Sequence, residues 1–154
     1  MQNNIVLPNG FLSVAEEELR NGHSVRLHAD GQSMFPFIRG LDDEIEIEPL
    51  APDTPLQPMA VYFYRWNGQY MVHRYIGEHN GLCVMLGDGN YCRTEEVPRC
   101  DISGKVRHIY RKDGSIQDCE DPNWLNKGKQ WVWLRPLRRI ILPVWRRLYR
   151  RFSR

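Results

Sequence analysis

The sequence has no long hydrophobic run. No stretch of about 18 consecutive apolar residues occurs among its 154 residues, so no segment is expected to cross a bilayer as a helix. Residues 1–10 also lack the basic start and the apolar centre of a secretory signal. We therefore expect a protein that works in the cytoplasm, either free or peripherally bound to the inner face of the membrane.

Cysteine is scarce and shows no metal-binding spacing. The four cysteines, Cys83, Cys92, Cys100 and Cys119, include no pair in the short C-x₂-C arrangement of a zinc site. Because no export signal is expected, disulfide bonds are not expected either. The sequence therefore predicts four free thiols, no metal ion and no cofactor.

Charge is unevenly distributed along the chain. The formal net charge is only +2, but residues 135–154 contain eight arginines and no acidic residue. Residues 1–134 contain 13 basic and 19 acidic residues, a net charge of −6. This division predicts an acidic folded domain, residues 1–134, followed by a basic tail, residues 135–154, that meets an anionic partner.

Short alternating apolar patterns predict a mainly β fold. Residues 23–29, 44–48, 61–66, 69–76, 82–86 and 102–110 have the pattern of strands, and Asn67-Gly68 between two of them is a strong hairpin signal. Residues 11–21 have the pattern of a helix, with a capping box from Ser13 to Glu16 and a stop at Gly22. So many short strands in one small domain indicate a coiled antiparallel sheet or partial barrel.

Ser33 lies in a segment suited to a nucleophile, Gly31-Gln32-Ser33-Met34-Phe35-Pro36. A serine hydroxyl attacks only when a base takes its proton and donors hold the oxyanion. Gly31 would allow a sharp turn and the close approach of a substrate, and Pro36 would stiffen the chain after that turn. By residue type alone, a serine near a glycine is more often a simple turn residue.

A histidine suited to act as the base follows at position 73. With an ordinary pKa of about 6.5, a histidine can accept a proton at neutral pH without extreme burial. His73 lies on a predicted strand, where Met71 and Tyr75 share its face. The alternative is a histidine that only makes a structural hydrogen bond.

Four blocks occur in order within residues 20–110. They are Gly31-Gln32-Ser33-Met34-Phe35-Pro36, Met71-Val72-His73-Arg74-Tyr75-Ile76, Leu86-Gly87-Asp88-Gly89-Asn90 and Ile102-Ser103-Gly104-Lys105-Val106. Together they resemble the blocks of the S24/S26 peptidases, the superfamily of the signal peptidases and the LexA-like self-cleaving repressors. The resemblance implies the coiled β fold of that group, and the chain is most similar to its short, unanchored bacterial members with a histidine in the base position.

The resemblance also implies roles for particular residues. Ser33 would be the nucleophile and His73 the general base, while Gly31, Met34 and Pro36 would contact the substrate.

The third member of the site is less well defined by the resemblance. Asp88 would orient His73 and stabilise its cation, as the acid of a serine triad does. The alternatives are that Asp88 only caps the turn that contains it, and that Glu95 or Glu96 is the orienting acid.

The sequence departs from the signal-peptidase pattern at Gly31, where those enzymes commonly have a hydroxyl residue that helps to hold the oxyanion. The backbone N–H of Ser33 is then the one oxyanion donor that can be named. We expect a serine endopeptidase that cleaves a peptide or protein precursor through an acyl-enzyme. The alternative is a catalytically weak or inactive peptide-binding or regulatory module with the same fold.

The basic tail has the period of an amphipathic helix that Pro143 should kink or split near Leu142. Its apolar residues are Leu137, Ile140, Ile141, Val144, Trp145, Leu148, Tyr149 and Phe152, and its basic face comprises Arg138, Arg139, Arg146, Arg147, Arg150 and Arg151. Such a helix suits an anionic membrane surface, although its apolar stripe could equally pack on the acidic domain. The chain has no recognised nucleic-acid motif, so nucleic acid is not expected as a partner.

Overall fold

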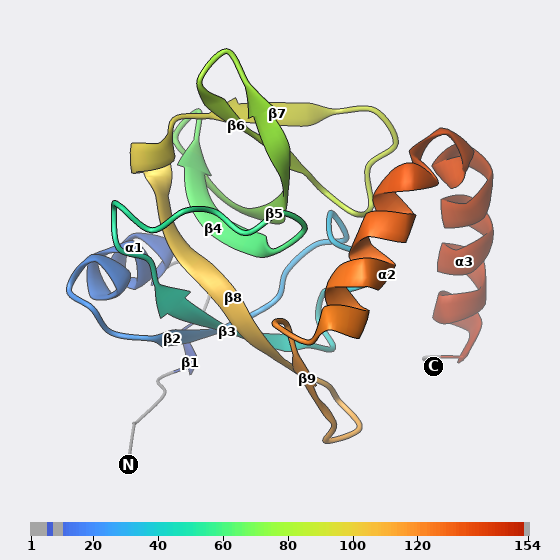
Figure 1. The fold of residues 1–154 in the computed structure, drawn as a ribbon. Coiled ribbons are helices and arrows are strands. Elements are labelled where there is room, and N and C mark those ends of the chain that lie inside the picture. The colour runs from blue at the N-terminus through green and yellow to red at the C-terminus, as the bar shows by residue number, and fades with distance from the viewer. Residues whose placement is uncertain (1–5, 8–10, 153–154) are drawn as a thin grey trace.

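One curled sheet forms the body of the protein. The computed structural model describes residues 6–7 and 11–152. Nine strands lie in a single sheet in the order β1-β2-β3-β8-β4-β5-β6-β7, with β9 beside β8. Neighbouring strands are antiparallel except β1 and β2, which are parallel. The sheet curls into a half-barrel (Figure 1), which confirms the predicted mainly β fold.

The elements follow one another along the chain in this order. The strands are β1 (Val6–Leu7), β2 (Val25–His28), β3 (Glu44–Pro49), β4 (Val61–Trp66), β5 (Gln69–His79), β6 (Leu82–Leu86), β7 (Thr94–Val97), β8 (Ile102–Tyr110) and β9 (Ile116–Asp118). The helices are α1 (Leu12–Arg20), α2 (Pro122–Trp133) and α3 (Arg138–Phe152), with short 3₁₀ turns η2 (Arg99–Asp101) and η3 (Arg135–Leu137).

The hairpin between β4 and β5 forms where its turn residues predict it. Asn67 and Gly68 have φ values of 48° and 74°, the left-handed conformation that a two-residue turn of this kind requires. The turn pairs Trp66 with Gln69 and places Tyr62 opposite His73. The local turn chemistry therefore sets the neighbours of His73 on β4.

Helix α1 is present, but the capping box predicted at its start is not. No side chain caps its first turn. Glu16 is instead largely buried, and its carboxylate accepts hydrogen bonds from Arg20 at 2.8 Å and from Tyr70 at 2.8 Å. The tertiary contacts of Glu16 thus replace the capping role that the local pattern predicts for it.

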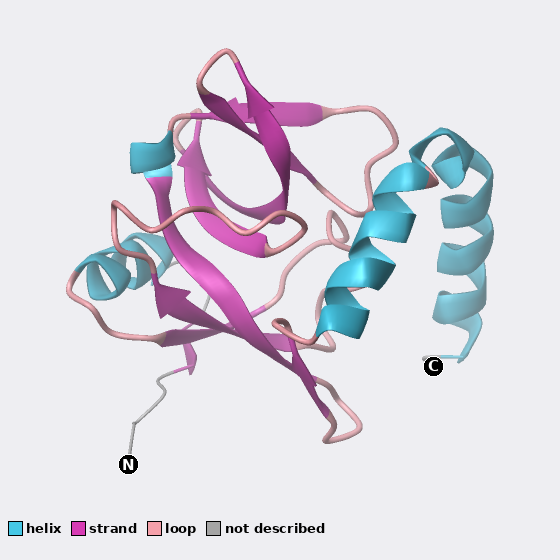
Figure 2. Ribbon diagram, viewed as in Figure 1, coloured by secondary structure: helices cyan, strands magenta, loops and turns pink. Residues whose placement is uncertain are grey.

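Helix α2 was not predicted from the sequence. Asp121 caps it by accepting from the Asn123 N–H at 2.8 Å, and Pro122 occupies its first position. Trp124 and Trp131, seven residues apart, are both buried. Helices α2 and α3 lie together at one side of the molecule and α1 at the opposite side (Figure 2).

Helix α3 runs unbroken from Arg138 to Phe152 with Pro143 inside it. The predicted split near Leu142 is therefore wrong. A proline removes one backbone hydrogen bond, and here Leu142 is fully buried with Phe35 and Trp131, so packing offsets the loss. Over the described part of the chain, no helix is both long enough and apolar enough to cross a membrane.

Candidate active site

The fold brings Ser33 and His73 to one pocket. Ser33 lies in the loop between β2 and β3, and His73 lies on β5. Both line a pocket of about 220 Å³. Ser33 is partly exposed, whereas His73 is almost completely buried. Two residues far apart in the sequence therefore line one pocket.

The walls of this pocket are mainly apolar. Of the three residues predicted to contact a substrate, Gly31 and Met34 line this pocket and Pro36 does not. Gly31 adopts a φ of 70°, which a residue with a side chain rarely does. The remaining apolar walls are Leu12, Leu27, Ala29, Ile38, Ile45, Phe63, Tyr70, Met71 and Val72.

A buried acid and a tyrosine hold the His73 ring. Nδ1 of His73 lies 2.9 Å from Oε2 of Glu95 and 2.9 Å from the hydroxyl of Tyr64. The Tyr64 O–H donates to the same Glu95 oxygen at 3.2 Å. All three side chains are buried. Burial and the adjacent Glu95 carboxylate raise the pKa of Tyr64, so this hydroxyl remains a donor at neutral pH.

This arrangement assigns the proton on the neutral His73 ring. Because a carboxylate only accepts hydrogen bonds, Nδ1 must carry the hydrogen that Glu95 receives. Nε2 then holds a lone pair. That is the tautomer in which a histidine can take a proton from a neighbouring hydroxyl.

Nε2 of His73 faces the loop of Ser33 across Gly87. A Cβ added to Gly87 would lie 2.6 Å from the Ser33 carbonyl oxygen and 3.1 Å from His73 Nε2. Nε2 is buried and has no hydrogen-bond partner among the described residues. Ser33 and His73 are therefore not hydrogen-bonded in this structure. The close contacts at position 87 leave room only for a glycine.

Asp88 does not contact His73. Both of its carboxylate oxygens accept from Arg74, at 2.9 Å from Nε and 2.7 Å from Nη2. The prediction that Asp88 orients His73 is therefore wrong, and Glu95, the alternative considered, holds the ring. Glu96 lies outside this network, because its carboxylate is 2.7 Å from exposed His79.

Asp88 instead anchors the turn next to the Ser33 loop. Its backbone carbonyl accepts from Trp131 Nε1 at 2.9 Å, and the N–H of the next residue, Gly89, donates to the Ser33 carbonyl at 2.7 Å. The guanidinium of Arg74 lies over the rings of Phe37 and Trp124. The Arg74–Asp88 pair therefore fixes the Gly87–Asn90 turn, and through Gly89 it fixes the Ser33 loop.

Helix α3 reaches the same turn from the other side. Arg138, fully buried, donates to the carbonyls of Gly87 at 3.2 Å and Asn90 at 2.9 Å. Arg146 donates to the carbonyls of Gly89 at 3.0 Å and Gln32 at 3.4 Å. The prediction that Arg138 belongs to a lipid-facing surface is wrong, because this side chain is fully buried. Arg146 is partly buried.

Sequence reasoning missed Tyr64, Arg74 and Arg138 as parts of this site. Tyr64 had a usable signal, since the Asn67-Gly68 hairpin places Tyr62 and Tyr64 on β4 opposite the strand of His73. Arg74 and Arg138 had none, because a buried arginine is indistinguishable in sequence from an exposed one.

Comparison with known proteins leaves the geometry as the main evidence. No protein-family model matches the chain, and no curated protein matches it. Within the described ranges, no three or more histidine, cysteine or acidic side chains gather as a metal site would.

Proposed function

We propose that the protein is a serine peptidase in which Ser33 is the nucleophile and His73 the general base. One observation carries the proposal, namely the state of the two ring nitrogens of His73. Nδ1 is hydrogen-bonded to Glu95, whereas Nε2 is buried and has no hydrogen-bond partner among the described residues. Nε2 also lies near the Ser33 backbone. A histidine in this state is ready to take a proton from a serine in the same pocket. The resemblance of the four sequence blocks to the S24/S26 peptidases supports the same function.

The proposed reaction proceeds through an ester. His73 Nε2 takes the hydroxyl proton as Ser33 Oγ adds to the peptide carbonyl, and Glu95 stabilises the imidazolium. The tetrahedral intermediate collapses, the C–N bond breaks, and Nε2–H protonates the departing amine. A water gives a proton to His73 Nε2 as its oxygen adds to the ester carbonyl, the C–Oγ bond then breaks, and Nε2–H returns the proton to Ser33 Oγ. The Ser33 N–H donates to the oxyanion in both steps.

For catalysis, substrate binding must bring Ser33 Oγ within hydrogen-bond distance of His73 Nε2. Catalytic hydrogen bonds are often longer without substrate and shorten in the Michaelis complex. The apolar walls of the pocket favour a peptide with an apolar side chain near the bond that is cut.

A fluorophosphonate probe tests the nucleophile directly. We expect mass spectrometry to find the adduct on Ser33 of the wild-type protein and none on Ser33→Ala. Ser115→Ala, which changes an exposed serine on the β8–β9 turn, should label like wild type. A peptide library should likewise yield new termini with wild type and not with Ser33→Ala.

One observation favours the alternative of a peptide-binding module, namely that His73 Nε2 is not hydrogen-bonded to Ser33. If the folded wild-type protein neither labels at Ser33 nor cleaves any library peptide, yet retains peptides from that library, the peptidase proposal is wrong and the module is the function.

A further inference from the structure

The rest of the domain covers only part of the apolar side of helix α3. Leu142 is fully buried, and Ile141 and Tyr149 are partly buried against the same cluster. The rest of this apolar side faces outward. Its exposed side chains are Ile140 (70%), Val144 (54%), Leu148 (49%) and Phe152 (82%). Spaced four residues apart, these four side chains form one outer stripe along the helix.

Two further apolar side chains that precede α3 in the sequence are also exposed. Leu137 is 50% exposed, and Trp133 at the end of α2 is 81% exposed. Single exposed apolar residues are common, but a contiguous row of them marks a surface that meets a partner. Tryptophan is enriched where an apolar phase meets water.

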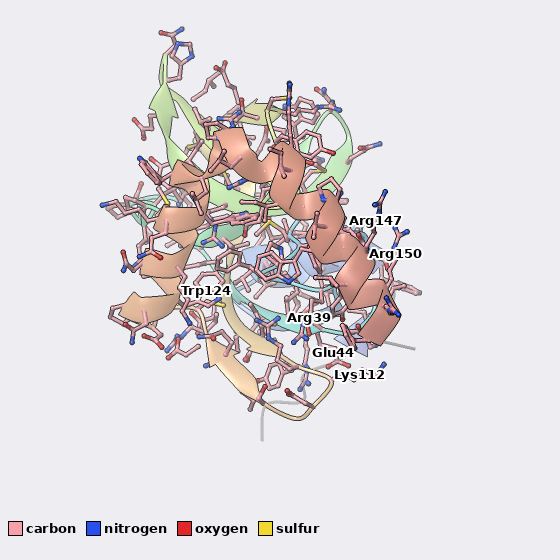
Figure 3. The ribbon with its side chains drawn as sticks, turned by 90° about the vertical axis from the view of Figure 1, so that its right-hand side faces the viewer. Arg39, Glu44, Lys112, Trp124, Arg147 and Arg150 are labelled. Carbon is pink, nitrogen blue, oxygen red and sulfur yellow. The ribbon has the colours of Figure 1, made fainter. Side chains whose placement is uncertain are left out.

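Four arginines of α3 are exposed: Arg139, Arg147, Arg150 and Arg151. At 3.6 residues per turn, Arg147 and Arg151 lie nearest the outer stripe. Figure 3 shows Arg147 and Arg150 directed away from α2. Residues 135–154 contain no acidic side chain, and the ion pairs of the described residues include none of these four arginines. Their charge is therefore available to an external anion.

We infer that the outer stripe and these four arginines dock α3 flat on an anionic lipid surface. In a bilayer with anionic headgroups, the apolar side chains of such a helix enter the acyl boundary and its arginines reach the phosphates. Guanidinium groups bind phosphate well through paired N–H donors. A second copy of the chain fits less well, because two such helices would bring eight arginines together without a counter-charge.

The inner side of α3 determines how the inference must be tested. Arg138 and Arg146 bind carbonyls of the Ser33 loop and of the turn beside it, so removing the helix would disturb the domain as well as the surface. Point variants of exposed residues in the full chain avoid this. Vesicle binding also does not depend on whether Ser33 is catalytic, so failure of this inference is separable from failure of the peptidase proposal.

The experiment is co-sedimentation of the full chain with phosphatidylcholine vesicles that contain or lack phosphatidylglycerol. We expect binding to the anionic vesicles at low salt, little binding to the neutral ones, and weaker binding at about 0.5 M salt. Arg147→Gln/Arg150→Gln/Arg151→Gln should weaken binding roughly 100-fold, since each basic residue at such a surface contributes about fivefold. Ile140→Gln/Val144→Gln/Leu148→Gln should weaken it at least about tenfold.

Matched variants separate this surface from general charge and hydrophobicity. Arg65→Gln/Lys112→Gln/Lys129→Gln removes three exposed cations elsewhere, and Phe11→Gln/Leu41→Gln/Ile116→Gln removes three exposed apolar side chains elsewhere. Both should bind much more tightly than their α3 counterparts. The inference is overturned if wild type does not bind anionic vesicles, if each control loses as much binding as its counterpart, or if light scattering shows that the outer stripe is covered in a stable dimer.

Discussion

Nδ1 of His73 lies 2.9 Å from Oε2 of Glu95, and both side chains are buried. This pair decides the tautomer of the ring, since the carboxylate must receive the Nδ1 hydrogen. Asp88, the acid of the block Leu86-Gly87-Asp88-Gly89-Asn90, binds Arg74 instead. The two acids thus have separable positions, one on the His73 ring and one on the turn next to the Ser33 loop.

The first prediction separates Glu95 from Asp88. In Glu95→Gln the new amide can donate to Nδ1, which favours the tautomer with hydrogen on Nε2 and so removes the base. We expect fluorophosphonate labelling of Ser33 to slow about a thousandfold or more, with a smaller effect on unfolding. Asp88→Asn should instead affect stability more than labelling. We expect a loss of about 3–5 kcal/mol from the free energy of unfolding, because Arg74 stays buried without its charged partner.

Labelling rate and urea unfolding, measured on both variants, check this assignment. Labelling of Glu95→Gln at the wild-type rate would show that Glu95 does not orient the base.

The second prediction concerns the glycine between Ser33 and His73. A Cβ at position 87 would meet the Ser33 carbonyl at 2.6 Å, so Gly87→Ala must displace the nucleophile loop. We expect slower labelling of Ser33 and a loss of about 1–3 kcal/mol of stability. The control is Gly81→Ala, at a φ of 75° with no atom near the added Cβ. It should lose about 1–2 kcal/mol and label like wild type.

The third prediction compares two adjacent arginines of α3. Arg138 is buried and supplies donors to the carbonyls of Gly87, Asn90 and Trp131, whereas Arg139 is exposed. Burial lowers the pKa of Arg138 to about 10, so it remains charged at neutral pH. Arg138→Gln should lower the free energy of unfolding by about 2 kcal/mol or more, and Arg139→Gln by less than about 0.5 kcal/mol. Equal losses in urea unfolding would contradict this assignment.

The fourth prediction is a pH dependence of the α3 attachment. The Tyr149 hydroxyl donates to Asp42, and this bond, with Lys112 nearby, lowers the pKa of Asp42 below its ordinary 3.8. A carboxylate with a lower pKa in the folded state contributes stability that is present above about pH 4 and is lost as the pH falls through the lowered pKa.

Tyr149→Phe tests this dependence because it removes the donor. We expect a loss of about 1 kcal/mol near neutral pH and a smaller difference from wild type at about pH 3, by urea unfolding at both pH values. A difference that grows on acidification would exclude the proposed role of Asp42.

Several elements follow from local sequence alone. Asn67-Gly68 specifies its hairpin because both residues tolerate the left-handed backbone that a two-residue turn needs. The strands with clear alternation, such as β8 over Ile102–Tyr110, form where the period predicts them. Ser33 and His73 could be selected as a pair from their sequence blocks, and the fold then places both on one pocket.

The partner of His73 could not be predicted in the same way. Asp88 and Glu95 both follow β6, and which carboxylate reaches the ring depends on how β5, β6 and β7 pair. The structure pairs Met85 with Glu95 and interrupts the β5–β6 pairing between Tyr75 and Gly77. A bulge changes which side chains share a face, and such a bulge leaves no reliable mark in one sequence.

The sequence by itself determined the β-rich class, the turn that positions β5 and the amphipathic period of α3. Each of these depends on backbone preference or on side-chain spacing within a few residues. Tertiary structure decided the rest: that Glu95 holds the His73 ring, that Asp88 anchors a turn, and that Arg138 is buried while Arg139 is exposed. Helical period places arginines on a common face, but only packing against the Gly87–Asn90 turn selects the one that is taken out of water.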